Sequence, residues 1–285
     1  MNWKHTKSFL IILLAAVNVF LFFLASEYYA ENNYTSEQTA SGAVRLLSDS
    51  DINVSESLLS VKNDNADILI CKYDREEYLC SVAALFFGKE ADGIYLLPGG
   101  IRAETYEGGT ALLNYDMSLS FTAPELIGKG QTLSESAYIP EKKDSKAERE
   151  ALEKLIALPG GSLDNAHCIK SGEYMFITVN QTENGLPLYD MNCIFGIKGE
   201  KIVYASGKHL FSVPEEKQDT QILNRVNILF SEKERGVSGT VTDMTLCYTL
   251  YEATATGSML LIPSYAVTYS DGRVSAINAV SKDLY

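Results

Sequence analysis

The first 25 residues constrain this chain more than any other part of its sequence. Two basic residues, Lys4 and Lys7, precede an unbroken apolar run from Phe9 to Ala25. A helix that spans a bilayer needs about 20 apolar residues, and lysines next to such a helix stay in the cytoplasm. The pattern therefore predicts a cytoplasmic segment over 1–8, a transmembrane helix over 9–25 and a C-terminal domain outside the cell.

A cleaved signal peptide is the main alternative for the same segment. Cleavage requires small residues at the cut site, and the candidate cut after Ala25 has the bulky Phe23 where a small residue is needed. The sequence therefore favours an uncleaved anchor. Within this helix the amide of Asn18 is either a tolerated lone polar group or a contact to another transmembrane helix.

Composition bounds the classes of partner and of fold. The chain has 285 residues, of which 46% are hydrophobic, and this is enough to build a packed core. Its formal net charge of −13 argues against nucleic acid and anionic lipid as partners. The five cysteines match no zinc or redox spacing, so we interpret them as small buried residues, with one disulfide left open.

Helices and strands are predicted to recur along the chain. Apolar residues at helical spacing predict helices over about 36–48, 75–87, 146–157 and 220–230. Runs of β-forming residues follow each of the last three helices, and Gly, Asn or Asp turns separate these runs. One such run is Ile94–Leu97. We interpret each helix with its strands as one unit.

The predicted fold class is therefore α+β. A single N-terminal transmembrane helix is followed by an ectodomain of about three units, each a helix laid on an antiparallel sheet. The expected segments after the anchor are a membrane-proximal unit over 35–121, a linker over 122–144, a second unit over 145–214 and a third unit over 215–285. The linker is placed where prolines, glycines and charged residues cluster.

The sequence carries no signature of catalysis. Its three histidines, His5, His167 and His209, are isolated, and it has no metalloprotease HExxH motif. It also has no nucleophile elbow and no glycine-rich phosphate loop. We therefore expect no catalytic residues, no metal and no cofactor.

Two segments of the distal half carry a recognisable combination of residues. The matching positions are Gln181, Gly185 and Pro187 in the first segment, and Pro263, Tyr265, Asp271, Gly272 and Asn278 in the second. Together with the opening from Trp3 to Leu21, they resemble the YycI-type proteins of the YycH/YycI family. Tyr265 stands where that family tends to have Trp. The distal units, roughly 145–285, also look like PepSY-type domains.

The resemblance implies regulation without catalysis. YycI-type proteins regulate the sensor histidine kinase WalK, or YycG, of low-GC Gram-positive bacteria, often with a YycH-like partner. The expected partner is thus a sensor kinase at the cell membrane, which the anchor contacts through Asn18, while the other matching residues are structural.

Two other functions compete with this one. The first is a PepSY-like binding or inhibitor module for an extracellular peptidase or peptide, which would work with residues 35–285 alone. The second is a hydrolase without a recognisable motif, which would need clustered acids or Ser and His in one cleft. The scattered histidines argue against the hydrolase.

Overall fold

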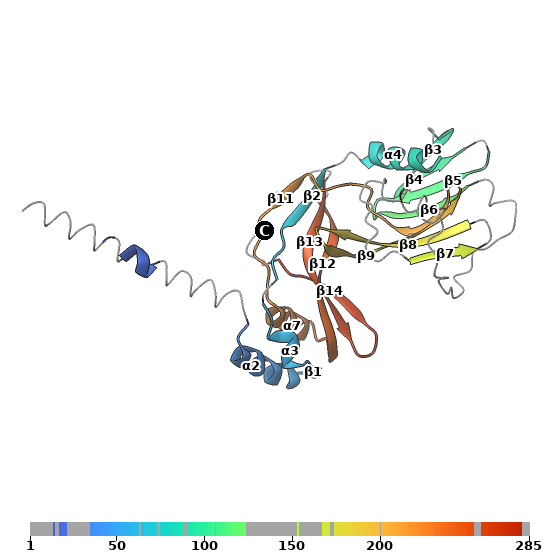
Figure 1. Ribbon diagram of the computed structural model, residues 1–285. Helices are drawn as coiled ribbons and strands as arrows, with labels where there is room; N and C mark the ends of the chain where they lie inside the picture. The colour runs from blue at the N-terminus through green and yellow to red at the C-terminus, as the bar shows by residue number, and fades with distance from the viewer. Residues whose placement is uncertain are drawn as a thin grey trace, which may run out of the picture. The chain divides into compact units, whose positions relative to one another are not determined.

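The computed structural model describes two compact units of the chain (Figure 1). The described residues are 14, 17–21, 35–62, 64–72, 75–87, 91–105, 107–123, 153, 167–171, 174–199, 201–253 and 258–280. The first unit takes its residues from 1–66, 221–245 and 265–285, and the second from 67–220 and 246–264. Each unit is therefore built from segments that lie far apart in the sequence.

Helices α2 (Glu37–Ser48), α3 (Glu56–Leu59) and α7 (Arg225–Glu234) belong to the first unit. Helix α2 begins where predicted, because the hydroxyl of Ser36 accepts a hydrogen bond from the Thr39 amide at 3.2 Å. Helix α7 begins later than the predicted residue 220. The amide of Leu223 donates to the carbonyl of Ala279 at 2.7 Å, which holds this segment extended until Asn224 caps the helix.

The strands of the first unit are β1 (Ile52–Asn53), the start of β12 (Gly239–Ala253), the end of β13 (Ser258–Tyr269) and β14 (Val274–Asn278). Strand β1 pairs in parallel with β12, and β14 pairs with β13. The buried apolar side chains of this unit come from both helices and strands: Ala40, Ala43, Leu47, Ile52, Leu59, Ile228, Leu229 and Val267.

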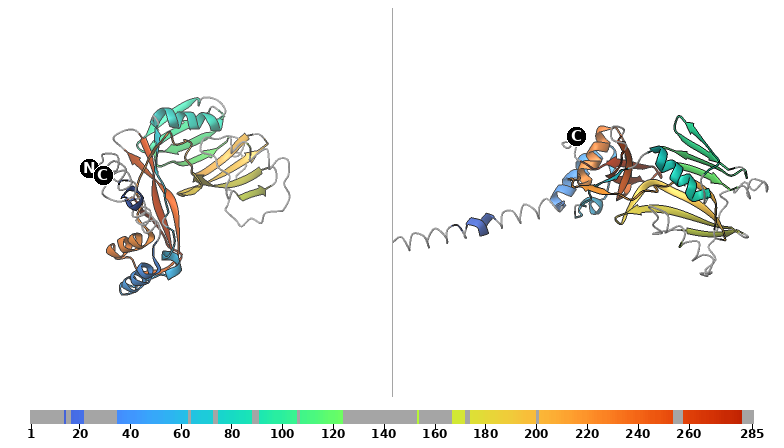
Figure 2. Two further views of the ribbon diagram at one scale, coloured as in Figure 1. Left: turned by 60° about the vertical axis from the view of Figure 1, so that its left-hand side comes forward. Right: turned by 90° about the horizontal axis from the view of Figure 1, so that it is seen from above.

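The second unit is a sheet with one described helix, α4 (Arg75–Phe87). Its further strands are β2 (Ile68–Lys72), β3 (Gly93–Leu97), β4 (Gly100–Glu104), β5 (Thr110–Asn114), β6 (Ser118–Thr122), β7 (His167–Ser171), β8 (Tyr174–Glu183), β9 (Leu186–Lys198), β10 (Lys201–Lys208) and β11 (Glu216–Gln218). The strand order is β11-β2-β13-β12-β9-β10-β6-β5-β4-β3. Off this path, β8 pairs with β9 and β7 pairs with β8, and these yellow strands lie side by side in Figure 2.

The core of the second unit lies between helix α4 and one face of this sheet. A single register row crosses seven strands on that face: Ile94, Ala103, Ala111, Phe121, Ala205, Phe195 and Ile177. All of these residues are buried except Ile94. Helix α4 contacts β4 and β5, and the ring of Phe86 stacks on that of Phe121 at 4.9 Å between centroids.

The predicted fold class is wrong. The described chain is dominated by a mixed β-sheet, and it does not form three consecutive helix-on-sheet units. The reason is that strands pair across the expected unit boundaries: β6 pairs with β10, and β9 pairs with β12. Local sequence patterns do not contain these long-range pairings.

The prediction of a membrane-spanning helix over 9–25 is also corrected. No helix in the described ranges is long and apolar enough to cross a membrane. Within the predicted span over 9–25, only Leu14 and Val17–Leu21 are described, and they are helical. Most of the expected linker over 122–144 and of the expected helix over 146–157 lies outside the described residues.

Candidate functional site

Strand β3 forms an exposed apolar edge of the second unit. It stands at one end of the strand order and pairs antiparallel with β4, from Gly93 opposite Glu104 to Leu97 opposite Gly100. The four side chains after Gly93 are exposed: Ile94 by 45%, Tyr95 by 54%, Leu96 by 63% and Leu97 by 37%. Soluble proteins usually protect such edges with charges, prolines or bulges. We call this strand the β3 edge.

A tight hairpin holds the β3 edge against β4. The carbonyl of Gly99 in this turn accepts a hydrogen bond from the Tyr115 amide at 2.8 Å. A Cβ atom on Gly100 would lie 2.0 Å from the carbonyl oxygen of Leu113, so only glycine lets β4 approach β5 this closely. The β3 edge is therefore attached to two closely packed strands, β4 and β5.

The β3 edge is apolar on both faces of the sheet. Ile94 and Leu96 lie in register with Ala103 and Ile101, which are fully buried. They therefore lie on the face of the sheet that packs against α4, but they are exposed. Tyr95 and Leu97 lie on the opposite face. On that face Tyr95 is in register with Arg102, and Arg102 with the exposed Leu112.

The two ends of the β3 edge differ in charge. Near Gly93, three acidic residues lie at the same end of the strands: Asp92, Glu104 and Glu107. The amide of Asp92 donates to the carbonyl of Glu104 at 2.9 Å, and Arg102 forms an ion pair with Glu104. The opposite end turns through Pro98 and Gly99, which carry no charge. Acidic residues thus lie at the Gly93 end of the edge and not in its Pro98-Gly99 turn.

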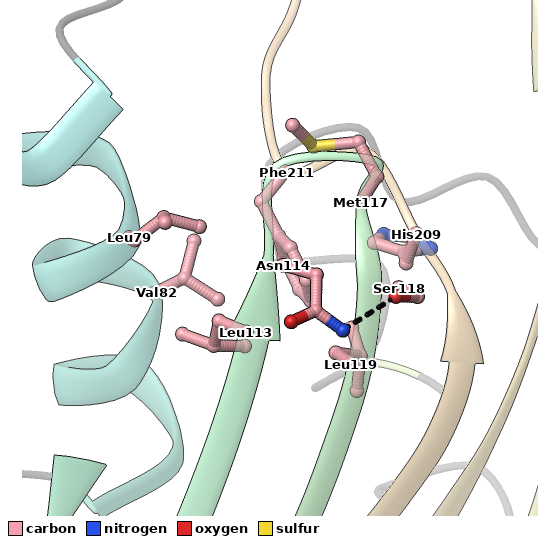
Figure 3. Close-up of a pocket in the computed structure, with 9 residues that line it drawn as sticks. All are labelled: Leu79, Val82, Leu113, Asn114, Met117, Ser118, Leu119, His209 and Phe211. Atoms are coloured by element: carbon pink, nitrogen blue, oxygen red, sulfur yellow. Dashed lines mark hydrogen bonds between the residues drawn. The ribbon is translucent and has the colours of Figure 1, made fainter. Parts of the chain in front are cut away.

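A small cavity lies between α4 and the sheet (Figure 3). Its lining residues are Leu79, Val82, Leu113, Asn114, Met117, Ser118, Leu119, His209 and Phe211. Its volume of about 10 Å³ has room for about one water molecule and is far below the ~300 Å³ of small-molecule pockets. The ring of His209 packs edge-on against that of Phe211 at 4.5 Å between centroids. We interpret this cavity as a packing defect of the core.

Charged groups inside the first unit bond to one another. The hydroxyl of Tyr265 donates to Asp64 Oδ2 at 2.9 Å, and Arg225 Nη2 lies 3.5 Å from the same oxygen. Burial and the negative charge of Asp64 raise the pKa of Tyr265 above its ordinary value. Glu232 is fully buried and accepts hydrogen bonds from the Tyr269 hydroxyl at 2.8 Å and from Arg235 at 2.9 Å. These contacts join α7 to β13 and give the groups a structural role.

Gln181, Gly185 and Pro187 lie in or beside the hairpin of β8 and β9. Gln181 is buried, its amide nitrogen donates to the carbonyl of Leu210 at 2.8 Å, and its amide oxygen accepts from the Leu210 amide at 2.9 Å. Gly185 has φ +78° and follows Asn184 at φ +50°, which is the conformation of a two-residue hairpin turn. Pro187 pairs opposite Thr182 in the hairpin.

The remaining predicted residues lie apart from the β3 edge in the sequence and in the sheet. Pro263 and Tyr265 are in β13, and Asp271 and Gly272 form the turn between β13 and β14. Asn278 ends β14, where its side-chain oxygen accepts from the Val280 amide at 2.8 Å. Their side chains serve the turn, the strand ends and the core.

Asn18, the predicted transmembrane contact, lies in the helical stretch 17–21 with its side chain exposed. The structure does not gather the matching residues into one site.

The β3 edge is the functional candidate that sequence reasoning missed. Its strand was predicted, but a continuous apolar run is typical of a strand buried on both faces. The neighbouring Pro98-Gly99-Gly100 turn marks a hairpin but does not place it within the sheet, so the sequence held no signal for the exposed edge. Within the described ranges no group of three or more His, Cys, Asp or Glu residues could hold a metal ion.

Comparison with known proteins gives weak structural neighbours. No protein-family model and no curated protein matches the chain. An uncharacterised protein from Eubacterium rectale matches with a TM-score of 0.41 and 12% identity, over 80% of this chain and 86% of that one. The C-terminal domain of YpeB from Bacillus megaterium matches with a TM-score of 0.22 and 12% identity, over 86% of this chain and 99% of that one. At these TM-scores neither likeness carries an argument, and the YycI-type family is not shown.

Proposed function

We propose that this protein regulates another protein by direct contact, without catalysis, and that the β3 edge is its contact surface. The observation that carries the proposal is the exposure of Ile94, Tyr95, Leu96 and Leu97 on a framework that is otherwise closely packed. Exposed apolar patches on soluble domains mark interaction sites, and unprotected strand edges invite pairing with another chain.

The partner that we propose is a sensor histidine kinase of the WalK, or YycG, type, on the extracellular side of the membrane. The resemblance of the distal segments to YycI-type proteins supports this partner, and it adds a YycH-like protein as a second one. A regulator of a two-state kinase needs only to bind one state better than the other. The proposal concerns the described residues and does not depend on the N-terminal segment.

A second candidate is a binding or inhibitor module for an extracellular peptidase or peptide. The same edge favours it, because an extended peptide adds readily to an exposed sheet edge through main-chain hydrogen bonds. The two candidates differ in which protein lies against β3 in the cell.

Site-specific photo-cross-linking in the host separates these candidates. One variant carries a photoreactive residue in place of Tyr95, and a matched control carries it in place of Val213, whose side chain is 59% exposed and lies between β10 and β11. We expect position 95, but not position 213, to cross-link to a sensor kinase. A peptidase adduct at position 95 would favour the second candidate. Equal labelling from both positions, or none, would refute the contact surface.

A further inference from the structure

We infer that strands β12 and β13 form a hinge, a two-stranded ribbon about which the two compact units bend relative to each other. The inference concerns a motion of the chain and does not depend on which partner the protein binds. Three observations support it: the division of the chain between the units, the strands that flank the ribbon, and the hydrogen bonds within it.

Among the described strands, only β12 and β13 are shared between the two units. The division falls after Thr245 in β12 and after Ser264 in β13, so each strand begins in one unit and ends in the other. Every other described strand lies within one unit. The chain also crosses between 66 and 67 and between 220 and 221, where it has no regular secondary structure. In the described part of the chain, the ribbon is therefore the one regular connection.

The strands that flank the ribbon change at the division. Strand β12 pairs with β1 as far as Thr240, in the first unit, and with β9 at Tyr248, in the second. Between these two positions β12 carries exposed polar side chains: Thr242, Asp243 and Thr245. Strand β13 pairs with β2 as far as Leu261, in the second unit, and with β14 in the first. No flanking strand of the described chain therefore reinforces the ribbon across the division.

A connection of two strands bends more readily than a wide sheet. Adjacent strands twist through a larger range in two-stranded ribbons, and two strands alone are only marginally stable. Pro263 lies in β13 next to the division, and it has no N–H group to donate to a neighbouring strand. The ribbon is thus weakened at the position where the two units meet along the chain.

Side-chain hydrogen bonds tie the two strands together on either side of the division. In the second unit, Thr249 Oγ1 lies 2.7 Å from Ser264 Oγ, and Ser264 is fully buried. Ser264 Oγ also donates to the carbonyl of Ile262 at 3.2 Å. In the first unit, Thr242 Oγ1 donates to the carbonyl of Thr268 at 3.2 Å. These bonds hold β12 against β13, so the two strands bend as one ribbon.

A hinge of this kind gives a regulator several conformations for a partner to select. Units that share a limited connection are expected to move relative to each other. A partner that binds both units favours the bend in which it contacts both, and so shifts the population towards that bend. The ribbon then acts as the conformational element on which binding acts.

Distance distributions measured by pulsed electron paramagnetic resonance on the full-length chain test the inference. Spin labels are attached through non-natural amino acids, because the chain has five native cysteines. One pair of labels joins the units, at Leu46 in the first and Val213 in the second, and a control pair lies within the first unit, at Leu46 and Val274. These side chains are exposed by 54%, 59% and 45%. We expect the distribution between the units to be roughly twofold broader than that of the control pair.

Two valine substitutions locate the motion. Thr249→Val removes the hydroxyl beside Ser264, which ties the strands together next to the division, and should broaden the distribution between the units further. Thr242→Val makes the same chemical change in the same strand within the first unit, and should leave this distribution unchanged. In both variants the control pair should stay narrow, which shows that the first unit has kept its fold.

Three results would overturn the inference. Equal widths for both label pairs in the unmodified chain would show that the units move as one body. Equal responses to the two valine substitutions would show that the ribbon is no weaker at the division than elsewhere. A narrower distribution in Thr249→Val would show that its hydroxyl does not restrain the ribbon. Cross-linking at position 95 tests the proposed contact surface separately, so failure of either proposal is distinguishable from failure of the other.

Discussion

Strands β3 and β11 stand at the two ends of the strand order, and their exposed side chains differ in polarity. Strand β11 is short, and its three residues, Glu216, Lys217 and Gln218, are all polar and exposed. Strand β3 is longer, and its exposed residues are all apolar. Charges and short length are the usual protection of a strand edge against pairing. Because one end of the strand order has this protection and the other lacks it, the unprotected end is best explained by a partner.

The largest effect should come from truncating the buried neighbour of the β3 edge. Ile101 is fully buried and lies in register with Leu96, which is mostly exposed. Ile101→Ala should lower the free energy of unfolding by about 3 kcal/mol, because it removes buried methylenes and leaves a cavity. Leu96→Ala should change it by less than about 0.5 kcal/mol. Urea unfolding measures both, and similar losses would mean that the edge is part of the core.

A somewhat smaller effect should follow from Gly100→Ala. The added methyl group would collide with the carbonyl of Leu113, so β4 must move away from β5. We expect a loss of about 2 kcal/mol in the free energy of unfolding, as for other overpacked sites. Hydrogen exchange should accelerate in β3 and β4 and stay unchanged in β11, at the far end of the strand order. If hydrogen exchange accelerated equally in β3, β4 and β11, the two ends of the strand order would not open independently of each other.

Exchanging the chemistry of the two edges should alter association more than stability. The double substitution Glu216→Val with Lys217→Val makes β11 resemble β3, and we expect it to increase light scattering by concentrated protein. Leu96→Lys gives β3 the protection of β11 and should decrease the scattering. If both variants scatter like the unmodified protein, edge chemistry does not govern association in this chain.

The smallest effect concerns two buried thiols, one in β2 and one in β9. Burial raises the pKa of Cys71 in β2 to about 11 and that of Cys193 in β9 to about 12, from an ordinary value of 9.0. Below about pH 8 these thiols are protonated in both folded and unfolded chains, so they add no pH dependence. As the pH rises from 9 towards 11 only the unfolded chain ionises, and stability should fall. Replacing both cysteines with alanine should remove this part of the alkaline slope in urea titrations.

Local patterns predicted the elements well and their assembly poorly. Helix α4 and strand β3 were predicted almost to the residue, because apolar spacing and a proline-glycine turn are local signals. The sheet order was missed because it depends on long-range pairs, such as that of β6 with β10. The exposure of β3 depends on which other elements pack against it. A short stretch of sequence does not contain that information.

The structural roles of the matching residues were also hidden from the sequence. Tyr265 finds its hydrogen-bond acceptor in Asp64, 201 residues away along the chain. The side-chain amide of Gln181 bonds to both the carbonyl and the amide of Leu210, 29 residues away. A polar residue within an apolar strand pattern indicates a buried hydrogen bond, but only the fold shows which residue is its partner.

The interleaved composition of the first unit has a consequence for synthesis of the chain. That unit needs residues from 1–66, from 221–245 and from 265–285, so its core cannot close until almost the whole chain has left the ribosome. Helix α2, with Ala40, Ala43 and Leu47 on its apolar side, must therefore wait while the more than 150 residues of the first segment of the other unit, 67–220, emerge. Closing such a long loop slows folding and leaves that apolar side open to other proteins in the meantime. During synthesis the apolar side of helix α2 is thus exposed before its partners from 221–245 and 265–285 exist.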